Sequence, residues 1–179
     1  MEKNIFIFYN PPLINKPLNI RKSATTEVNM LAKHFLRNDI QTIVFARSRV
    51  RVELILSHLQ SLTKNEITDQ SLRGYRGGYL PKQRREIEKG LREGKIKGVV
   101  STNALELGVD IGQLQACIMT GYPGTIASAW QQAGRAGRRQ NESVIIMVAS
   151  SSPLDQYIIS NPDYFLNVIP NLHVLIQII

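Results

Sequence analysis

The sequence predicts an α/β domain in which helices cover both faces of a mainly parallel sheet. Short apolar runs such as 42–46 and 116–120 have no regularly alternating polar side, which is typical of strands buried on both faces. These runs alternate with segments whose apolar residues recur at helical spacing. Because such alternation favours a parallel sheet between two layers of helices, a three-layer architecture is expected.

The expected elements follow the chain as strand, loop and helix. A strand rich in Ile and Phe at 3–9 is stopped by Asn10-Pro11-Pro12. An apolar stripe between Val28 and Leu36 predicts a helix at about 26–37, and Ser48 is a candidate N-cap for the next helix. Further strands are expected at 42–46, 72–75, 98–101, 116–120 and 143–149, with a polar loop at 60–72 and helices at about 83–93 and 126–134.

Three segments are distinguished along the chain. Residues 1–22 are expected to form an N-terminal strand and an extended entry arm, and residues 23–160 the α/β domain itself. Residues 161–179 form an apolar tail that reads as the start of a following region or as foreign sequence. Because each buried aliphatic side chain gains about 1.5–3 kcal/mol relative to exposure, the tail is expected to dock on the domain or to drive self-association.

Composition narrows the class of protein. A chain of 179 residues with 43% hydrophobic content is ordinary for one globular domain. The single cysteine, Cys117, excludes a disulfide framework and a cysteine-based zinc site within this chain, and no metal ligands are expected here. No apolar run is long enough for a membrane helix and the start lacks a signal peptide pattern, so a cytoplasmic protein without a membrane partner is expected.

The positive charge is concentrated in the first part of the chain. The formal net charge is +8, yet residues 140–179 contain no Lys or Arg. Residues 73–97 alone hold nine basic side chains against three glutamates. A basic surface of this kind favours a polyanion, most often nucleic acid, and a solvated helix face is the alternative.

Polar and glycine-rich clusters follow the predicted strands. Arg47, Arg76, Thr102 and Gly121 each come just after a strand, and the carboxyl ends of parallel strands share one edge of a sheet. Downstream, Gly108-Val109-Asp110 forms a turn with a carboxylate. Arg135 and Arg138 lie three residues apart among glycines that allow a phosphate to approach closely. These groups are suited to polyphosphate and ribose.

The order and spacing of these clusters resemble the superfamily-2 helicases. Motifs V and VI of that family are similar to Ser101-Thr102-Asn103 with Gly108-Val109-Asp110, and to Gln-x-x-Gly-Arg-x-Gly-Arg at 131–138. Arg47-Ser48 resembles motif IV, and 74–78 lies where the family carries a nucleic-acid loop. The resemblance covers roughly 40–150 and is greatest for bacterial YprA-like DNA-repair helicases of the DEAD/DEAH-box type. It implies a RecA-like fold and the second, C-terminal lobe.

The resemblance also implies roles for individual residues. ATP would lie between this lobe and an N-terminal RecA-like lobe of the same polypeptide, with Arg135 and Arg138 as catalytic arginine fingers. The implied ATP-binding residues are Gln131, Gly134, Gly108 and Asp110. The implied contacts to single-stranded or tailed DNA are Arg47, Ser48, Arg76, Gly77, Thr102 and Asn103. Simpler interpretations are a turn cap for Asp110, a solvated helix end for the arginines, and a plain turn at 75–79.

Two groups that ATP hydrolysis requires are missing from the sequence. No Gly-x-x-x-x-Gly-Lys-Ser/Thr is present, and no two acids are adjacent to form the Asp-Glu pair that binds Mg²⁺. Mg²⁺ ligands are therefore expected from the first lobe, and this chain alone is expected to be inactive. Gln131-Gln132, Asn103 and Leu107 differ from the residues that RNA-remodelling relatives carry at these positions, which favours DNA. The alternatives are an RNA helicase lobe and a non-catalytic nucleic-acid-binding or regulatory module with this fold.

Overall fold

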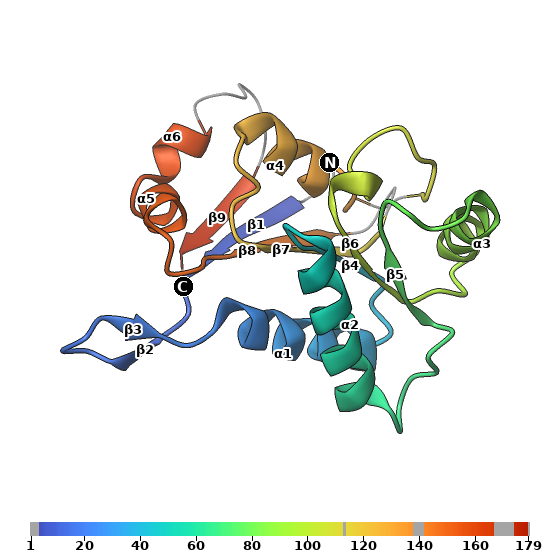
Figure 1. Ribbon diagram of the computed structural model, residues 1–179. Coiled ribbons are helices and arrows are strands. Elements are labelled where there is room, and N and C mark those ends of the chain that lie inside the picture. Colours follow the sequence, from blue (N-terminus) through green and yellow to red (C-terminus); the bar gives the residue numbers. More distant parts are fainter. Residues whose placement is uncertain (1–3, 113, 138–141, 167–173, 179) are drawn as a thin grey trace.

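The computed structural model describes residues 4–112, 114–137, 142–166 and 174–178, which form a three-layer α/β fold (Figure 1). Seven strands build the central sheet in the order β5-β6-β4-β7-β8-β1-β9, and neighbouring strands are parallel. The strands are β1 (Asn4–Tyr9), β4 (Thr42–Phe45), β5 (Leu72–Tyr75), β6 (Gly98–Ser101), β7 (Ala116–Thr120), β8 (Ser143–Val148) and β9 (Val174–Ile178). The predicted fold class is confirmed.

Helices pack on both faces of the sheet. They are α1 (Ala24–Arg37), α2 (Arg49–Thr63), α3 (Pro81–Arg92), η1 (Asn103–Leu105), α4 (Ile126–Ala133), α5 (Pro153–Ser160) and α6 (Pro162–Leu166). In Figure 1, α1 and α2 lie below the sheet, and α4, α5 and α6 lie above it. Two separate apolar clusters fill the space between the layers.

The strands supply both clusters by simple alternation. In β4, Ile43 and Phe45 belong to the cluster under α4, whereas Val44 belongs to the cluster under α1 and α2. Neighbouring β6 divides in the same way, with Val99 on one side and Val100 on the other. Successive side chains of a strand point to opposite faces, so a strand between two helical layers needs apolar side chains on both of its faces. This is why the runs read from the sequence show no polar side.

Helix α2 is longer than the sequence predicts. The polar composition of 60–63 predicts a loop, but the helix continues to Thr63. Thr63 is buried, and its hydroxyl donates to the carbonyl oxygen of Leu59 at 2.7 Å. A hydroxyl that bonds the carbonyl one turn back is satisfied inside a helix, which composition alone does not reveal. The N-terminus agrees with the prediction, because the Ser48 hydroxyl accepts from the amide of Arg51 at 3.2 Å.

The expected extended arm at 13–22 is instead a small antiparallel hairpin of β2 (Leu13–Asn15) and β3 (Ile20–Arg21). It projects from the body of the molecule (Figure 1). The Asn15 side chain accepts from the amide of Leu18 at 3.1 Å, and Asn19 takes a positive φ of 51°. Pro17 and two asparagines are the residues that such turns favour. The arm prediction missed this turn chemistry.

Elements from all three segments of the chain share one sheet. β1, from residues 1–22, lies between β8, from the central segment, and β9, from the tail. Phe165 of α6 is buried against Phe6 and Phe8, with ring centroids 5.2 and 5.4 Å apart. No helix in the described ranges is both long and apolar enough to cross a membrane.

Candidate nucleotide and nucleic-acid interface

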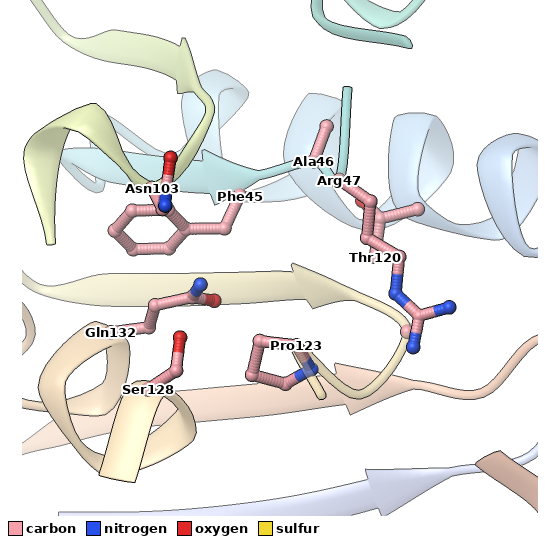
Figure 2. A pocket seen from close by; sticks show the side chains of 9 residues that line it. Phe45, Ala46, Arg47, Asn103, Thr120, Pro123, Ser128 and Gln132 are labelled. Atoms are coloured by element: carbon pink, nitrogen blue, oxygen red, sulfur yellow. The ribbon is translucent and has the colours of Figure 1, made fainter. Parts of the chain in front are cut away.

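A cavity of about 280 Å³ opens at the carboxyl ends of the central strands (Figure 2). It is lined by the end of β4 (Phe45, Ala46, Arg47), by Asn103 of η1, by residues at the end of β7 (Thr120, Gly121, Pro123) and by α4 (Ser128, Gln132). The chain passes from β4 to α2 on one face and from β7 to α4 on the other. Neighbouring strands whose helices leave on opposite faces form a topological switch point, where α/β sheets usually bind ligands.

Arg47 is held at the rim of this cavity by a buried carboxylate. Its guanidinium donates to Asp155 at 3.1 Å and to the carbonyl oxygen of Tyr122. Asp155 of α5 is only 1% exposed, and it also accepts from the amide of Tyr122 at 3.2 Å and from the amide and hydroxyl of Ser150 at 2.8 and 2.6 Å. The Arg47 side chain remains 43% exposed. The cation is therefore fixed in direction but still reaches solvent.

Thr120 and Asn103 are two further polar groups that line the cavity. The Thr120 hydroxyl is buried and, within the part of the chain that the structure describes, has no hydrogen-bond partner. Asn103 is exposed, and in Figure 2 it faces the α4 side chains across the cavity. Thr102 caps η1 through its hydroxyl, which accepts from the amide of Ala104 at 3.4 Å. A cation, a free hydroxyl and an amide suit an anionic or sugar ligand.

Arg76, which follows β5, and Arg49 of α2 form a second basic cluster beside Gly77. Arg76 donates to Glu53 of α2 at 2.7 Å, and its guanidinium carbon lies 5.1 Å from the centre of the Tyr79 ring. A Cβ at Gly77 would lie 3.2 Å from the guanidinium of Arg49. The missing side chain thus lets two arginines lie near the same stretch of backbone. These contacts hold the turn at 75–79 in place. They are compatible both with a plain turn and with a loop that binds nucleic acid.

Arg135 lies just after α4 and holds the loop after η1. It donates to the carbonyl oxygen of Glu106 at 3.2 Å through Nε and at 3.0 Å through Nη2, and to that of Val109 at 2.9 Å through Nη1. Burial lowers the pKa of Arg135, and the negative charge of nearby Asp110 acts in the opposite direction. A guanidinium has five N–H donors, so two have no partner among the described residues and could serve a ligand.

The other predicted ATP-side residues lie on this loop and on α4. Asp110 is exposed and accepts from the amide of Gly112 at 3.3 Å through one carboxylate oxygen. Gly108 has a φ of +73°, which a side chain rarely adopts. Gln131 is half-buried on α4, and a Cβ added to Gly134 would lie 3.3 Å from the carbonyl oxygen of Trp130. Arg138 lies outside the described residues.

Three residues of this region were not identified from the sequence. Asp155 follows Ser152 by three residues, and this Ser-x-x-Asp spacing at the start of a helix was the available signal. Thr120 was a hydroxyl at the end of an apolar strand. Glu106 lies between the two halves of motif V, and nothing in its spacing indicated a contact with α4. Trp130 of α4 packs on Phe165 at 4.9 Å between ring centroids, against the apolar core under this helix.

A family model described as helicase conserved C-terminal domain matches residues 26–140. The chain is 76% identical over 165 residues to the ATP-dependent helicase YprA of Bacillus subtilis, covering 92% of this chain and 22% of that protein. It is 38% identical over 165 residues to the ATP-dependent helicase HRQ1 of Saccharomyces cerevisiae, covering 90% of this chain and 15% of that protein.

Solved structures agree with the sequence matches. The helicase MrfA bound to DNA is 72% identical, with a TM-score of 0.89 over 97% of this chain and 23% of that one. MrfA bound to DNA and AMPPNP gives a TM-score of 0.87 at 71% identity, over 96% of this chain and 23% of that one. This chain thus spans less than a quarter of the length of each of these relatives. It belongs to the helicase conserved C-terminal domain family, as the second RecA-like lobe of a superfamily-2 helicase of the YprA type.

Proposed function

We propose that this chain is the C-terminal lobe of a cytoplasmic ATP-dependent DNA helicase, in which it supplies arginine fingers and part of the grip on DNA. The observation that carries the proposal is the position of Arg135. It joins the loop at 106–109 to the end of α4, and two of its five donors have no partner in the described part of the chain. Relatives named as ATP-dependent helicases, and MrfA solved with DNA and AMPPNP, support the same function.

On the ATP side, the guanidiniums of Arg135 and Arg138 would approach the γ-phosphate when the two lobes close. A positive charge there stabilises the transition state of phosphoryl transfer, and one finger is typically worth about 10³–10⁵ in rate. Gln131 would donate its amide near the phosphates, and Asp110 would accept from a ribose hydroxyl through its remaining oxygen. Gly108 and Gly134 leave the backbone open to the nucleotide. Mg²⁺ would supply positive charge that stabilises the charge developing on the phosphates, and its protein ligands would come from the N-terminal lobe.

On the DNA side, the cavity at the switch point would receive the sugar-phosphate backbone. Arg47 and the Thr120 hydroxyl offer a cation and a donor for a phosphate oxygen, and Asn103 lies across the same cavity. Thr102 and Ser48 lie at the starts of η1 and α2, where backbone amides favour anions. Arg76 and Gly77 would hold the next stretch of backbone. Contacts of this kind are mostly to phosphate, so binding should depend little on sequence.

The test is made in the complete helicase, which carries both lobes. Arg135→Ala or Arg138→Ala should reduce the rate of ATP hydrolysis by about 10³-fold or more while the Kd for a non-hydrolysable ATP analogue changes little. Equal loss of nucleotide binding and turnover would mark both arginines as ground-state ligands instead. Competition between single-stranded DNA and RNA of the same sequence decides the nucleic acid, and preference for RNA would contradict the DNA assignment.

A further inference from the structure

Glu106 contacts α4 through its side chain. One carboxylate oxygen, Oε2, accepts from the hydroxyl of Ser128 at 2.7 Å and from the side-chain amide of Gln132 at 3.1 Å. Ser128 and Gln132 are one helical turn apart, so they share a face of α4. Gln132 is only 5% exposed, so without Glu106 its amide would be buried with no acceptor from this loop. The carboxylate therefore fixes the loop after η1 against the body of α4.

The main chain of the same residue contacts the end of α4. The carbonyl oxygen of Glu106 accepts two of the three described hydrogen bonds of the Arg135 guanidinium. Glu106 thus contacts α4 near its first turn, near its last turn and just beyond it. A change in the position of Glu106 must move Arg135 or break these hydrogen bonds.

Glu106 is also tied to the DNA side. It is the C-cap of η1, a single turn that begins at the Thr102 N-cap and contains Asn103. The amide of Glu106 donates to the carbonyl oxygen of Asn103 at 3.0 Å, which closes this turn. Asn103, Ser128 and Gln132 line the same cavity, and Figure 2 shows them on opposite walls of it. One short turn therefore connects a proposed DNA contact to a proposed catalytic arginine.

We propose that Glu106 is a positioning residue that couples DNA binding at Thr102 and Asn103 to the placement of Arg135 on the ATP side. The inference rests on the proposed function. It assigns to Glu106 a role in transmitting DNA binding to the ATP side. DNA that draws η1 toward the cavity would shift Glu106. The carboxylate of Glu106 would then move α4, and its carbonyl oxygen would move Arg135. Glu106 itself would touch neither DNA nor ATP.

The test compares Glu106→Ala with Glu106→Gln in the complete helicase by steady-state ATP hydrolysis with and without single-stranded DNA. Glu106→Ala should lower kcat in the presence of DNA about tenfold more than it lowers the basal rate, with the KM for ATP and the Kd for DNA nearly unchanged. Glu106→Gln should keep most of the stimulation, because both hydrogen bonds go to one oxygen that an amide also provides. Glu86→Ala, at an exposed position of α3, is the matched control.

A second variant guards against misfolding. Glu106→Ala combined with Gln132→Leu removes the buried amide together with its acceptor, which limits the loss of stability while leaving the coupling broken. The double variant should also lose stimulation. Wild-type stimulation in Glu106→Ala, or an equal fall of basal and stimulated rates that Glu106→Gln does not rescue, would overturn the inference. If the wild-type helicase shows no hydrolysis stimulated by DNA, the proposed function itself fails, and the two failures are thereby distinguished.

Discussion

At the scale of single residues, the buried carboxylate of Asp155 holds together the loops at the carboxyl ends of the central strands. It receives hydrogen bonds from the loops after β4, β7 and β8, through Arg47, Tyr122 and Ser150. A Cβ at Gly121 would lie 2.8 Å from its Oδ2, so this loop has no room for a larger residue beside it. These contacts orient Arg47, although α5 lies beyond the range that the helicase family model matches.

Replacing this carboxylate should destabilise the lobe. Asp155→Ala leaves four donors without their acceptor, and we expect the free energy of unfolding to fall by roughly 2–4 kcal/mol. Urea denaturation of the isolated chain, followed by circular dichroism, measures the change. Asp163→Ala removes an exposed acid from neighbouring α6 and should change stability by less than about 0.5 kcal/mol. A similar small effect for both variants would show that the buried network contributes little.

Two tyrosines should make stability depend on alkaline pH. The hydrogen bond to Glu27, together with burial, raises the pKa of Tyr9 to about 12. Burial and then the hydrogen bond to Glu88 raise the pKa of Tyr75 to about 12. Because the folded state retains these protons above the ordinary pKa of about 10, their contribution is complete below pH ~10 and is lost as pH rises toward 12.

The measurement is the free energy of unfolding in urea at several pH values between 8 and 12. Tyr9→Phe and Tyr75→Phe should each flatten the decline above pH ~10, because each removes one proton that only the folded state retains. Tyr157→Phe, at a position 51% exposed, serves as the control. Identical slopes for all four proteins would contradict the assignment.

At the scale of elements, the loop between β5 and α3 is held to α2 by the ion pair of Arg76 and Glu53. Exposed ion pairs contribute little to stability, so Arg76 can exchange Glu53 for a phosphate at small cost. Arg37 at the end of α1 forms a comparable pair with Glu66, but it precedes β4 and therefore lies toward the opposite edge of the sheet. The two arginines offer the same charge at different places.

This difference gives a prediction for DNA binding. The isolated lobe should bind single-stranded DNA weakly, with an affinity that falls steeply as salt rises. Arg76→Ala should reduce the slope of log Kd against log salt by about 1, which corresponds to the loss of one phosphate contact. Arg37→Ala should leave the slope unchanged. Fluorescence anisotropy of a labelled oligonucleotide at several salt concentrations provides both slopes. Equal reductions would mean that net charge alone, and not the loop, determines binding.

Other elements show what local signals predict well. β5, β6 and β7 begin and end at the predicted residues. For β6 and β7 the reason is burial on both faces, which requires a short, mainly apolar run between polar neighbours. The hairpin β2–β3 and helix α5 were missed. Both depend on short polar signals, the asparagines around Pro17 and Ser152 before Pro153. Such signals stabilise turns and caps by single hydrogen bonds, and the same residues also occur in plain loops.

At the scale of the whole molecule, the lobe offers cations and hydroxyls to a ligand but not the groups that hold magnesium and water. We therefore predict that the isolated chain has no ATP hydrolysis above background. Release of phosphate from a highly purified sample, with and without single-stranded DNA, tests this. Arg135→Ala is the matched control for a contaminating ATPase, since contamination would not respond to it. Hydrolysis that this variant abolishes would show that the chain is active by itself.

The fold class, the order of strands along the chain and the helicase family could be read from the amino-acid sequence, because they depend on apolar periodicity and on motifs that span short distances. Which polar groups meet depends on how the chain folds. Asp155 lies 108 residues from Arg47, and Glu106 lies 22 residues from Ser128. A hydrogen bond between residues so far apart requires the sheet to bring their loops to one edge, and it leaves no periodic trace in the chain. The motifs therefore identified the edge, and the contacts that orient Arg47 and Arg135 became visible only in the folded molecule.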